Sequence, residues 1–422
     1  MKIPKSSLPI KVKTDETLNT RLSNRLNFPL LISSLLIIII GLISVYSSTY
    51  NLPELHQNFY KQLYFAIFGL VIGAIVIFIP PKFFELLAVP IYIFSIFLLI
   101  LVLLIGKTVG GNQSWIQIGT ISLQPSEISK YAVILMLAYV FSQKHFNINS
   151  LKGFLTISII VAIPTMLIFL QKDIGTALIF FAVFIFGLFW NGLSAFSVFV
   201  LISPIISAFA SLLGIIPSIV TLILVIITLF YFKREFFLSL GIFGLNLSFV
   251  ILTEIFIHLL SPHQVKRIKN FIDQQYDPLG SGYNALQAKI AVGSGGLFGE
   301  GFLAGSQTQL KFIPKQWTDF IFCVVGEEFG FVGSIFVLSL YFILITQLIR
   351  IARLVDSAFQ SSVIIMFVSV FLFHTFVNIG MTIGLVPVIG IPLPLMSYGG
   401  SALVTNILMI STAMNFYRHR TI

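Results

Sequence analysis

The chain has 422 residues, of which 57% are apolar, only 9% are charged and 44 are phenylalanine. A soluble domain carries about 25% charged residues, so this composition excludes a soluble globular enzyme, and the length allows about ten to twelve membrane spans. The formal net charge is +10, and the single cysteine, Cys323, excludes an intramolecular disulfide and a cluster of thiolate metal ligands.

Apolar runs along the chain predict membrane spans. The first follows a basic tail, residues 1–28, which we expect to be retained because a cleavable signal peptide has its apolar segment nearer the start. The stretch 194–231 is too long for one span and holds Gly214 and Pro217, which favours two helices joined by a tight turn. The other spans are predicted at 29–46, 63–79, 86–105, 128–141, 154–170, 174–190, 236–260, 329–348, 359–377 and 402–414. The sequence therefore predicts an all-α, polytopic membrane bundle of about 12 helices, with 29–422 as a single transmembrane domain.

The distribution of basic residues predicts the orientation. With the N-terminus inside, fifteen of the 25 Lys and Arg residues fall on the cytoplasmic side. Of the ten outside, six lie in one long polar loop, 261–318, to which the positive-inside rule hardly applies. We therefore expect both termini to be cytoplasmic, in the cytoplasmic (inner) membrane. Most acids fall outside, so we expect an extracytoplasmic active site.

Three polar or broken segments share the predicted outer side: 106–130, the long loop 261–318 and 378–401. Irregular backbone at membrane depth is tolerated only where protein lines a cavity. The third segment contains three prolines, which indicates broken or re-entrant helix of the kind that lines a binding cavity. Such a cavity fits a transporter and an enzyme of lipid substrates equally. Glu254, Asn378 and Asn406 are polar residues expected inside spans.

Glu127 and Lys130 are the first candidates for chemistry. They lie three residues apart after a Pro-Ser helix start, so both fall on one face of the fourth span. On spacing alone, an ion pair at a helix end explains them as well as a site does. Trp115 suits either a sugar-stacking platform or an interfacial aromatic belt.

The long loop holds the other candidates. Lys266 and Arg267 belong to a basic cluster that suits a pyrophosphate or anionic lipid headgroups. Asp277 begins an Asp-Pro turn, where an aspartate is usually structural. His263 is the only histidine in the three segments, so a His-based triad or a multi-histidine zinc site is not expected there.

The order of motifs through these segments resembles the SEDS family (shape, elongation, division and sporulation proteins), in its RodA branch rather than its FtsW branch. The motifs are GGNQSWIQIGTISLQPSEISK at 110–130, KDIGTAL at 172–178, YDPLGSGYNALQAKIAVGSGGLFGEG at 276–301, TDFIF at 318–322, GEEFG at 326–330 and the block at 378–401. They span nearly 300 residues, and the terminal PLPLMSYGGS carries most of the specificity.

The resemblance implies a peptidoglycan glycosyltransferase that polymerises lipid II on the outer face of the membrane, for cell elongation and rod shape. It implies a class B penicillin-binding protein (a transpeptidase), the elongation machinery and membrane lipid as partners, and no nucleic acid. The family's catalytic carboxylate maps onto Asp277, which would be the general base in an inverting transfer with undecaprenyl pyrophosphate leaving.

The same resemblance implies the substrate contacts. Candidate substrate-binding residues are Glu127, Lys130, Trp115, Lys266, Arg267, Gln287 and Asp319. The charge on the leaving pyrophosphate needs cations, supplied by Lys and Arg or by a divalent metal, Mg²⁺ or Mn²⁺. A lipid II flippase remains the alternative, since it would show the same broken helices; it predicts vectorial movement, whereas the enzyme predicts a required outer carboxylate and a polymer.

Three features depart from the family's pattern. An Arg often precedes the tryptophan of the first motif, where this chain has Ser114, so the resemblance does not carry over the phosphate contact usually supplied there. The family commonly has Glu and His before T-D-F, where this chain has Lys315 and Trp317. The family core has about ten spans, so 194–231 is expected to be an inserted helix pair.

Overall fold

The computed structural model describes residues 25–51, 55–109, 111–119, 121–233, 235–259, 265, 281–310 and 312–420. The long helices of these ranges lie at the predicted spans: α2 (Phe28–Thr49), α3 (His56–Val76), α4 (Lys82–Ile105), α5 (Pro125–Phe141), α6 (Leu151–Leu170), α7 (Ile174–Trp190), α8 (Ala195–Leu212), α9 (Ile215–Tyr231), α10 (Phe236–Leu259), α14 (Ile321–Leu354), α15 (Ala358–Ile383) and α16 (Gly400–Arg418). Eight are long and apolar enough to cross a membrane by length and composition, and α7 and α9 are shorter apolar helices. The prediction of an all-α, polytopic membrane protein is confirmed.

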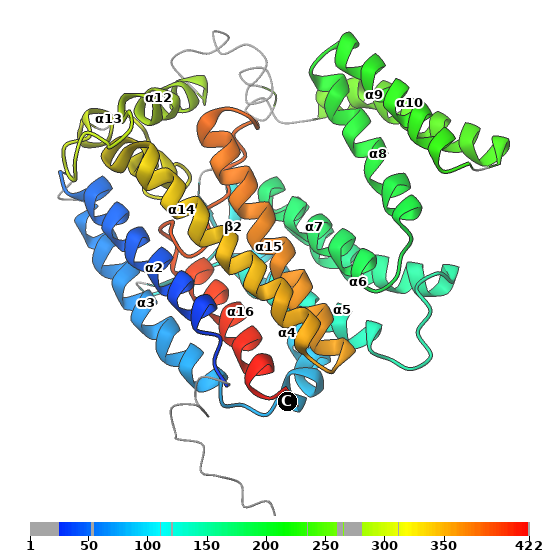
Figure 1. Ribbon diagram of the computed structural model, residues 1–422, viewed down its shortest axis with the longest axis horizontal. Coiled ribbons are helices and arrows are strands. Elements are labelled where there is room, and N and C mark those ends of the chain that lie inside the picture. Colours follow the sequence, from blue (N-terminus) through cyan, green and yellow to red (C-terminus); the bar gives the residue numbers. More distant parts are fainter. Residues whose placement is uncertain are drawn as a thin grey trace, which may run out of the picture.

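Helix α15 forms the centre of the bundle. In its apolar 18-residue stretch, 83% of the residues are buried. The helix packs against α14, α7 and α5 (Figure 1). A helix that is apolar on all sides is expected to be enclosed by other helices. On the far side of α14, α2 packs on that helix, and α3 packs on α16. Gly69 and Gly73 of α3 face Ile407 and Ser411 of α16 without room for a Cβ, so small residues let the two backbones approach closely.

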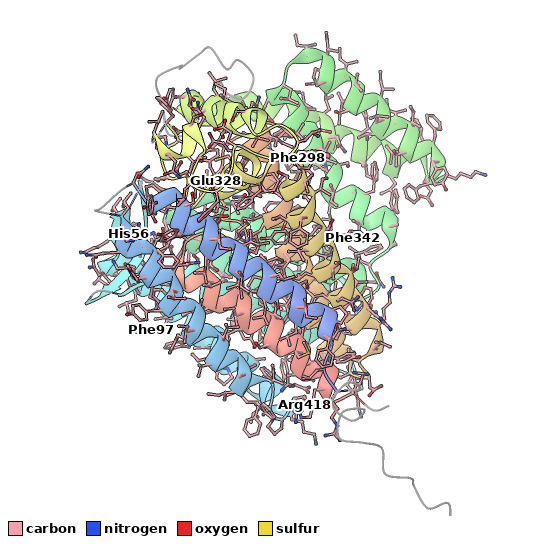
Figure 2. All side chains as sticks on the ribbon, turned by 60° about the vertical axis from the view of Figure 1, so that its left-hand side comes forward. His56, Phe97, Phe298, Glu328, Phe342 and Arg418 are labelled. Atoms are coloured by element: carbon pink, nitrogen blue, oxygen red, sulfur yellow. The ribbon has the colours of Figure 1, made fainter. Side chains whose placement is uncertain are left out.

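Apolar side chains cover the flanks of the bundle. Figure 2 shows Phe97 and Phe342 on the flanks, where they are 57% and 70% exposed. Glu328 and His56 lie near one end of the bundle and Arg418 lies at the other. Exposed apolar area of this extent marks a surface that contacts lipid or other apolar partners.

Helices α8, α9 and α10 pack chiefly on one another and stand beside the main bundle next to α7 (Figure 1). They share a small core of Phe196, Val225, Leu229 and Ile242. The predicted break within 194–231 is present at Gly214, whose φ of 120° favours glycine. The expectation that two of these helices are an insertion stays a prediction.

Short elements gather at one end of the bundle, called here the loop end. Strands β1 (Lys107–Val109), β2 (Asn112–Ile118) and β3 (Ile121–Leu123) form an antiparallel sheet in the order β1-β2-β3. Helices α12 (Ser281–Ser294) and α13 (Ser306–Gln309) lie at the same end (Figure 1). The expectation of irregular backbone before α5 is therefore wrong: in β2, Ser114 and Ile116 are buried while Gln117 is exposed, the alternation of a half-buried strand.

Helix α14 begins eight residues before the predicted span and is broken inside. Gly330 has φ 65° and ψ −157°, outside the helical region. The loop after α12 supplies partners for the broken turn: the N–H groups of Glu300 and Gly301 donate to the carbonyls of Glu327 and Glu328 at 2.9 and 3.1 Å. Phe331 N–H in turn donates to the Gly296 carbonyl at 2.9 Å. The backbone groups freed by the kink are thus paired, which an apolar environment requires.

The carboxylates beside this kink hold the loop in place. Glu327 accepts backbone N–H bonds from Gln307 and Thr308, at 2.6 and 2.9 Å, and so caps the start of α13. Glu328 accepts a hydrogen bond from Ser47 of α2. The side-chain amide of Gln309 donates to the Ser47 carbonyl at 3.3 Å. The segment that follows α12 is therefore fastened to both α14 and α2.

Candidate functional site

A cavity of about 310 Å³ lies at the loop end, where five segments distant in sequence meet. Three helices begin at it, since their N-cap residues, Gln124 of α5, Asp173 of α7 and Gly399 of α16, all line it. The lining residues are Asn112, Ser114, Trp115, Gln124, Glu127, Asp173, Thr176, Ile179, Lys315, Trp317, Thr318, Asp319, His374, Gly390, Ile391, Pro392, Tyr398, Gly399 and Ala402. A helix N-terminus carries a partial positive charge, so three of them together favour negative charge. Part of that charge is supplied by the protein itself, through Glu127 in the first turn of α5 and Asp173 at the start of α7.

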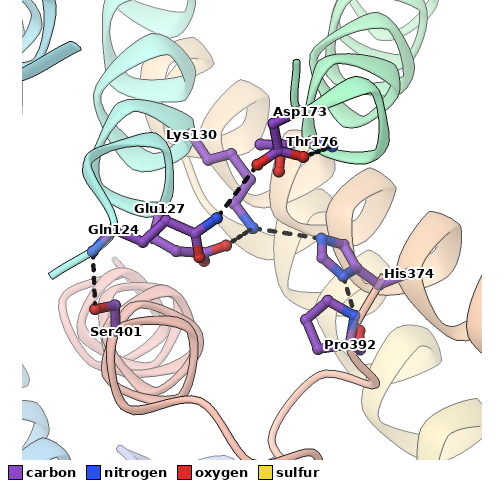
Figure 3. Close-up of polar contacts among 8 residues, drawn as sticks. All are labelled: Gln124, Glu127, Lys130, Asp173, Thr176, His374, Pro392 and Ser401. Carbon is purple, nitrogen blue, oxygen red and sulfur yellow. Dashed lines mark hydrogen bonds and ion pairs between the residues drawn. The ribbon is translucent and has the colours of Figure 1, made fainter. Parts of the chain in front are cut away.

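The predicted pair of Glu127 and Lys130 forms an ion pair in α5. Lys130 Nζ lies 2.9 Å from Glu127 Oε1, and the two side chains are 1% and 4% exposed (Figure 3). The pair is therefore buried and is not the exposed helix-end pair that spacing alone allowed. Glu127 Oε2 has no hydrogen-bond partner among the described residues, and Glu127 lines the cavity, so this oxygen is an unused acceptor beside it.

His374 of α15 is the second partner of Lys130. Its Nε2 lies 3.3 Å from Lys130 Nζ, and its Nδ1 lies 3.0 Å from the carbonyl oxygen of Pro392 (Figure 3). A carbonyl oxygen only accepts, so Nδ1 carries the proton and Nε2 accepts from the lysine. A chain of polar contacts thus runs from Glu127 through Lys130 and His374 to the segment after α15.

Asp173 joins the starts of α5 and α7. Its Oδ1 accepts from Thr176 N–H at 3.2 Å, which caps α7, and its Oδ2 accepts from Gln124 Nε2 at 3.3 Å. The backbone N–H of Gln124 donates to Ser401 Oγ of α16 at 3.2 Å (Figure 3). These bonds hold the three helix starts around the cavity.

The predicted broken block 378–401 forms the remaining wall. After α15 ends at Ile383, the chain returns as a non-helical segment to Gly400. Ser397 Oγ donates to the Thr318 carbonyl at 2.6 Å, and Tyr398 N–H donates to the Trp317 carbonyl at 2.9 Å. Burial raises the pKa of the Tyr398 phenol above its ordinary value, so that side chain stays neutral in the cavity wall.

The structure places some predicted residues together and not others. Trp115, Glu127 and Asp319 line the cavity, and Lys130 lies directly behind Glu127. Gln287 is half-buried on α12 and is not among the lining residues. Asp277, Lys266 and Arg267 lie outside the described residues, as does the side chain of Glu254. The positions that depart from the family's pattern, Ser114, Lys315 and Trp317, all line the cavity.

Sequence reasoning missed His374 and treated Asp173 only as an outer acid. A signal for His374 exists in the sequence, because it precedes Asn378 by four residues in a span that has no Asp, Glu, Lys or Arg. Two polar residues at that spacing share one face of a helix, and polar groups inside a span mark functional positions.

The described residues contain no group of three or more His, Cys, Asp or Glu side chains placed to hold a metal ion. Asp277 lies outside the described residues, so this absence does not extend to it. A protein-only metal centre is therefore not found in the described part of the chain.

Comparison with known proteins gives a consistent relationship. The profile of the FtsW, RodA and SpoVE family, described as cell cycle proteins, matches residues 28–221 and 198–422. The peptidoglycan glycosyltransferase MrdB of Escherichia coli (strain K12) is 35% identical over 352 residues, which cover 83% of each chain. The peptidoglycan glycosyltransferase RodA of Treponema pallidum (strain Nichols) is 32% identical and covers 92% of this chain and 96% of its own.

Solved structures agree on the fold. A chain of a peptidoglycan synthase complex, described as coordinating polymerisation and crosslinking, matches with a TM-score of 0.70 at 23% identity, covering 94% of this chain and 99% of its own. The rod shape determining protein RodA of Thermus thermophilus matches with a TM-score of 0.63 at 23% identity, covering 94% and 98%.

Proposed function

The chain belongs to the FtsW, RodA and SpoVE family of cell cycle proteins, and on that premise we propose that it is a peptidoglycan glycosyltransferase of cell elongation that polymerises lipid II into glycan strands. MrdB and RodA, which are 35% and 32% identical to it, are both named peptidoglycan glycosyltransferases. The observation that carries the proposal is the convergence of three helix N-termini and the buried Glu127–Lys130 pair on one cavity.

Three helix starts and Lys315 give this cavity positive charge for a pyrophosphate. The carboxylates of Glu127, Asp173 and Asp319 also line it and act against an anion unless a cation lies between them. Backbone N–H groups at helix starts and a fixed ammonium stabilise negative charge most strongly where water is excluded. Lys130 is held by two partners, so it needs little reorganisation when charge develops on a leaving group. In the proposed reaction this negative charge develops on the departing undecaprenyl pyrophosphate. Lys266 and Arg267 of the long loop would help to neutralise it.

The attacking sugar hydroxyl must lose a proton, and we assign that step to Asp277 as general base. The carboxylate accepts the proton while the new bond forms at the anomeric carbon, with inversion, and the bond to the pyrophosphate oxygen breaks. Asp277 precedes by four residues Ser281, where α12 begins, and α12 packs against α14 and α15. Trp115 and Asp319 are proposed to contact sugar, and Gln287 is proposed to bind substrate from α12.

A divalent cation, Mg²⁺ or Mn²⁺, is proposed as an aid to the leaving group. With no cluster of three donor side chains in the described residues, its protein donor would be Glu127, whose Oε2 has no hydrogen-bond partner among them, and substrate oxygens, the hard ligands that Mg²⁺ prefers, would complete its coordination. Addition of EDTA should then lower the polymerisation rate and excess Mg²⁺ or Mn²⁺ should restore it, while an unchanged rate in EDTA would remove the cation from the proposal.

The partner protein and the membrane orientation are proposed on the same grounds. We propose that a class B penicillin-binding protein crosslinks the strands that this chain makes, as part of the elongation machinery. The solved complex that matches this chain couples polymerisation and crosslinking, which supports the pairing. The site would then face outward from the cytoplasmic membrane, with both termini cytoplasmic.

Purified protein, together with its class B penicillin-binding protein, tests the proposal directly. Incubation with lipid II should yield glycan strands, seen as a ladder after electrophoresis, and the ladder should need both lipid II and this chain. A flippase would instead move labelled lipid II across the bilayer of a proteoliposome and form no polymer. That outcome would overturn the proposed glycosyltransferase function in favour of a transporter.

A further inference from the structure

We propose that His374 is a positioning residue that holds the Lys130 ammonium, behind Glu127, in the one orientation the transfer reaction uses. The inference rests on the proposed glycosyltransferase function and adds a residue to it. His374 lies on α15, whereas Glu127 and Lys130 lie on α5, so the lysine is held from two helices.

The donor and acceptor atoms of the three side chains determine which of them can bond to which. Lys130 has only donors, Glu127 as a carboxylate has only acceptors, and the Pro392 carbonyl has only acceptors. His374 is the one group among them that donates at one atom and accepts at another, and it does so at 3.0 Å to Pro392 and 3.3 Å to Lys130. A neutral imidazole satisfies both contacts, and an apolar side chain satisfies neither.

Burial makes the arrangement costly to disturb. His374 is 2% exposed and Lys130 is 1% exposed, so neither can exchange its partner for bulk water. Without His374, the Lys130 ammonium would keep Glu127 as its one remaining partner of the two. Its side chain could then adopt other rotamers. A displacement of about 1 Å at a charged group can cost roughly 100-fold in rate.

The wall of the cavity is tied to the same residue. One helical turn after His374, Asn378 Nδ2 donates to the Ile391 carbonyl at 2.8 Å, as His374 donates to Pro392. Both residues therefore hold the returning segment 390–392, but only His374 also reaches Lys130. A purely structural role would be shared by the two, whereas control of Lys130 belongs to His374.

Three variants separate these roles. His374→Gln carries an amide that donates at one atom and accepts at another, His374→Leu fills a similar volume with no polar atom, and Thr375→Val changes the next residue, whose hydroxyl has no hydrogen-bond partner among the described residues. Each is purified with the penicillin-binding protein, checked by thermal unfolding, and assayed for kcat and KM with lipid II.

We expect His374→Leu to lower kcat by at least about 10-fold with KM changed less than about 2-fold, since the lysine acts on charge that develops in the transition state. His374→Gln should recover most of kcat, and Thr375→Val should match the wild type. A kcat for His374→Leu that equals the wild type, or a Gln variant as slow as Leu at equal stability, would overturn the positioning role. Absence of polymer with the wild-type protein would instead overturn the proposed function, and the inference with it.

Discussion

Lys130 is a charged residue buried in an apolar bundle, with 1% of its surface exposed. Taking a charge out of water costs several kcal/mol, and the loss of one member of a buried pair costs about 3 to 5 kcal/mol. Lys130 is retained with a carboxylate at 2.9 Å and an imidazole at 3.3 Å. Apolar residues would fill the same space at no such cost, which favours a functional role for the pair.

A charge-neutral double variant separates stability from function. Lys130→Met or Glu127→Gln alone should lower the melting temperature, because each leaves an unmatched buried group, and should abolish polymerisation. The double variant Glu127→Gln with Lys130→Met should regain much of the thermal stability and none of the activity. Thermal unfolding and the lipid II assay measure both properties. Polymerisation by the double variant would mean that the pair is only structural.

The sequence predicted this pair and not its third member for a physical reason. Glu127 and Lys130 are three residues apart, so helical periodicity alone places them on one face. His374 lies 244 residues beyond Lys130, and only the packing of α15 on α5 joins them. Contacts of that range are set by tertiary structure, for which local pattern holds no information.

Single elements were predicted well where apolar periodicity is long and poorly where it is short. The twelve predicted spans coincide with long helices of the described residues, of which eight are long and apolar enough to cross a membrane. A long apolar run is a strong signal in the sequence. Strands β1 and β3 have three residues each, too few for an alternation to be read. Helix α14 begins earlier than predicted because GEEFG lowers its hydropathy, and the kink at Gly330 separates that polar part from the apolar remainder.

The kink in α14 gives a prediction at the element scale. At Gly330, φ is 65° and an added Cβ would overlap the backbone of Gly299 and Leu297. Gly330→Ala should therefore displace the loop after α12 and lower stability by roughly 1 to 3 kcal/mol. Gly293 of α12 has helical backbone and no atom within 4 Å of an added Cβ, so Gly293→Ala should be neutral or stabilising by about 0.5 to 1 kcal/mol.

Limited proteolysis and thermal unfolding of the two glycine variants provide the comparison. Faster cleavage within 295–310 is expected for Gly330→Ala alone. Equal behaviour of the two variants would show that the broken turn does not depend on glycine.

At the scale of the whole molecule, the basic residues give a topology prediction. The proposed orientation places Glu235 in the cytoplasm and Ser281 outside. Cys323 is fully buried and is replaced by alanine to give a background without cysteine. In intact cells, an impermeant thiol reagent should label Ser281→Cys and should reach Glu235→Cys only after lysis. Labelling in the reverse pattern would invert the membrane orientation and move the cavity to the cytoplasmic side.

The rate of lipid II polymerisation by Asp277→Asn, measured beside Asp273→Asn with the same penicillin-binding protein, tests the central claim most directly. The amide keeps size and turn propensity but cannot accept the proton, so Asp277→Asn should lose roughly 100-fold or more in rate. Lipid II binding should survive, because the cationic contacts remain, and Asp273→Asn, four residues earlier on the same loop, should polymerise normally. Normal polymerisation by Asp277→Asn with loss in Asp273→Asn would assign the base to the other carboxylate, and normal rates in both would contradict an enzymatic role for the loop.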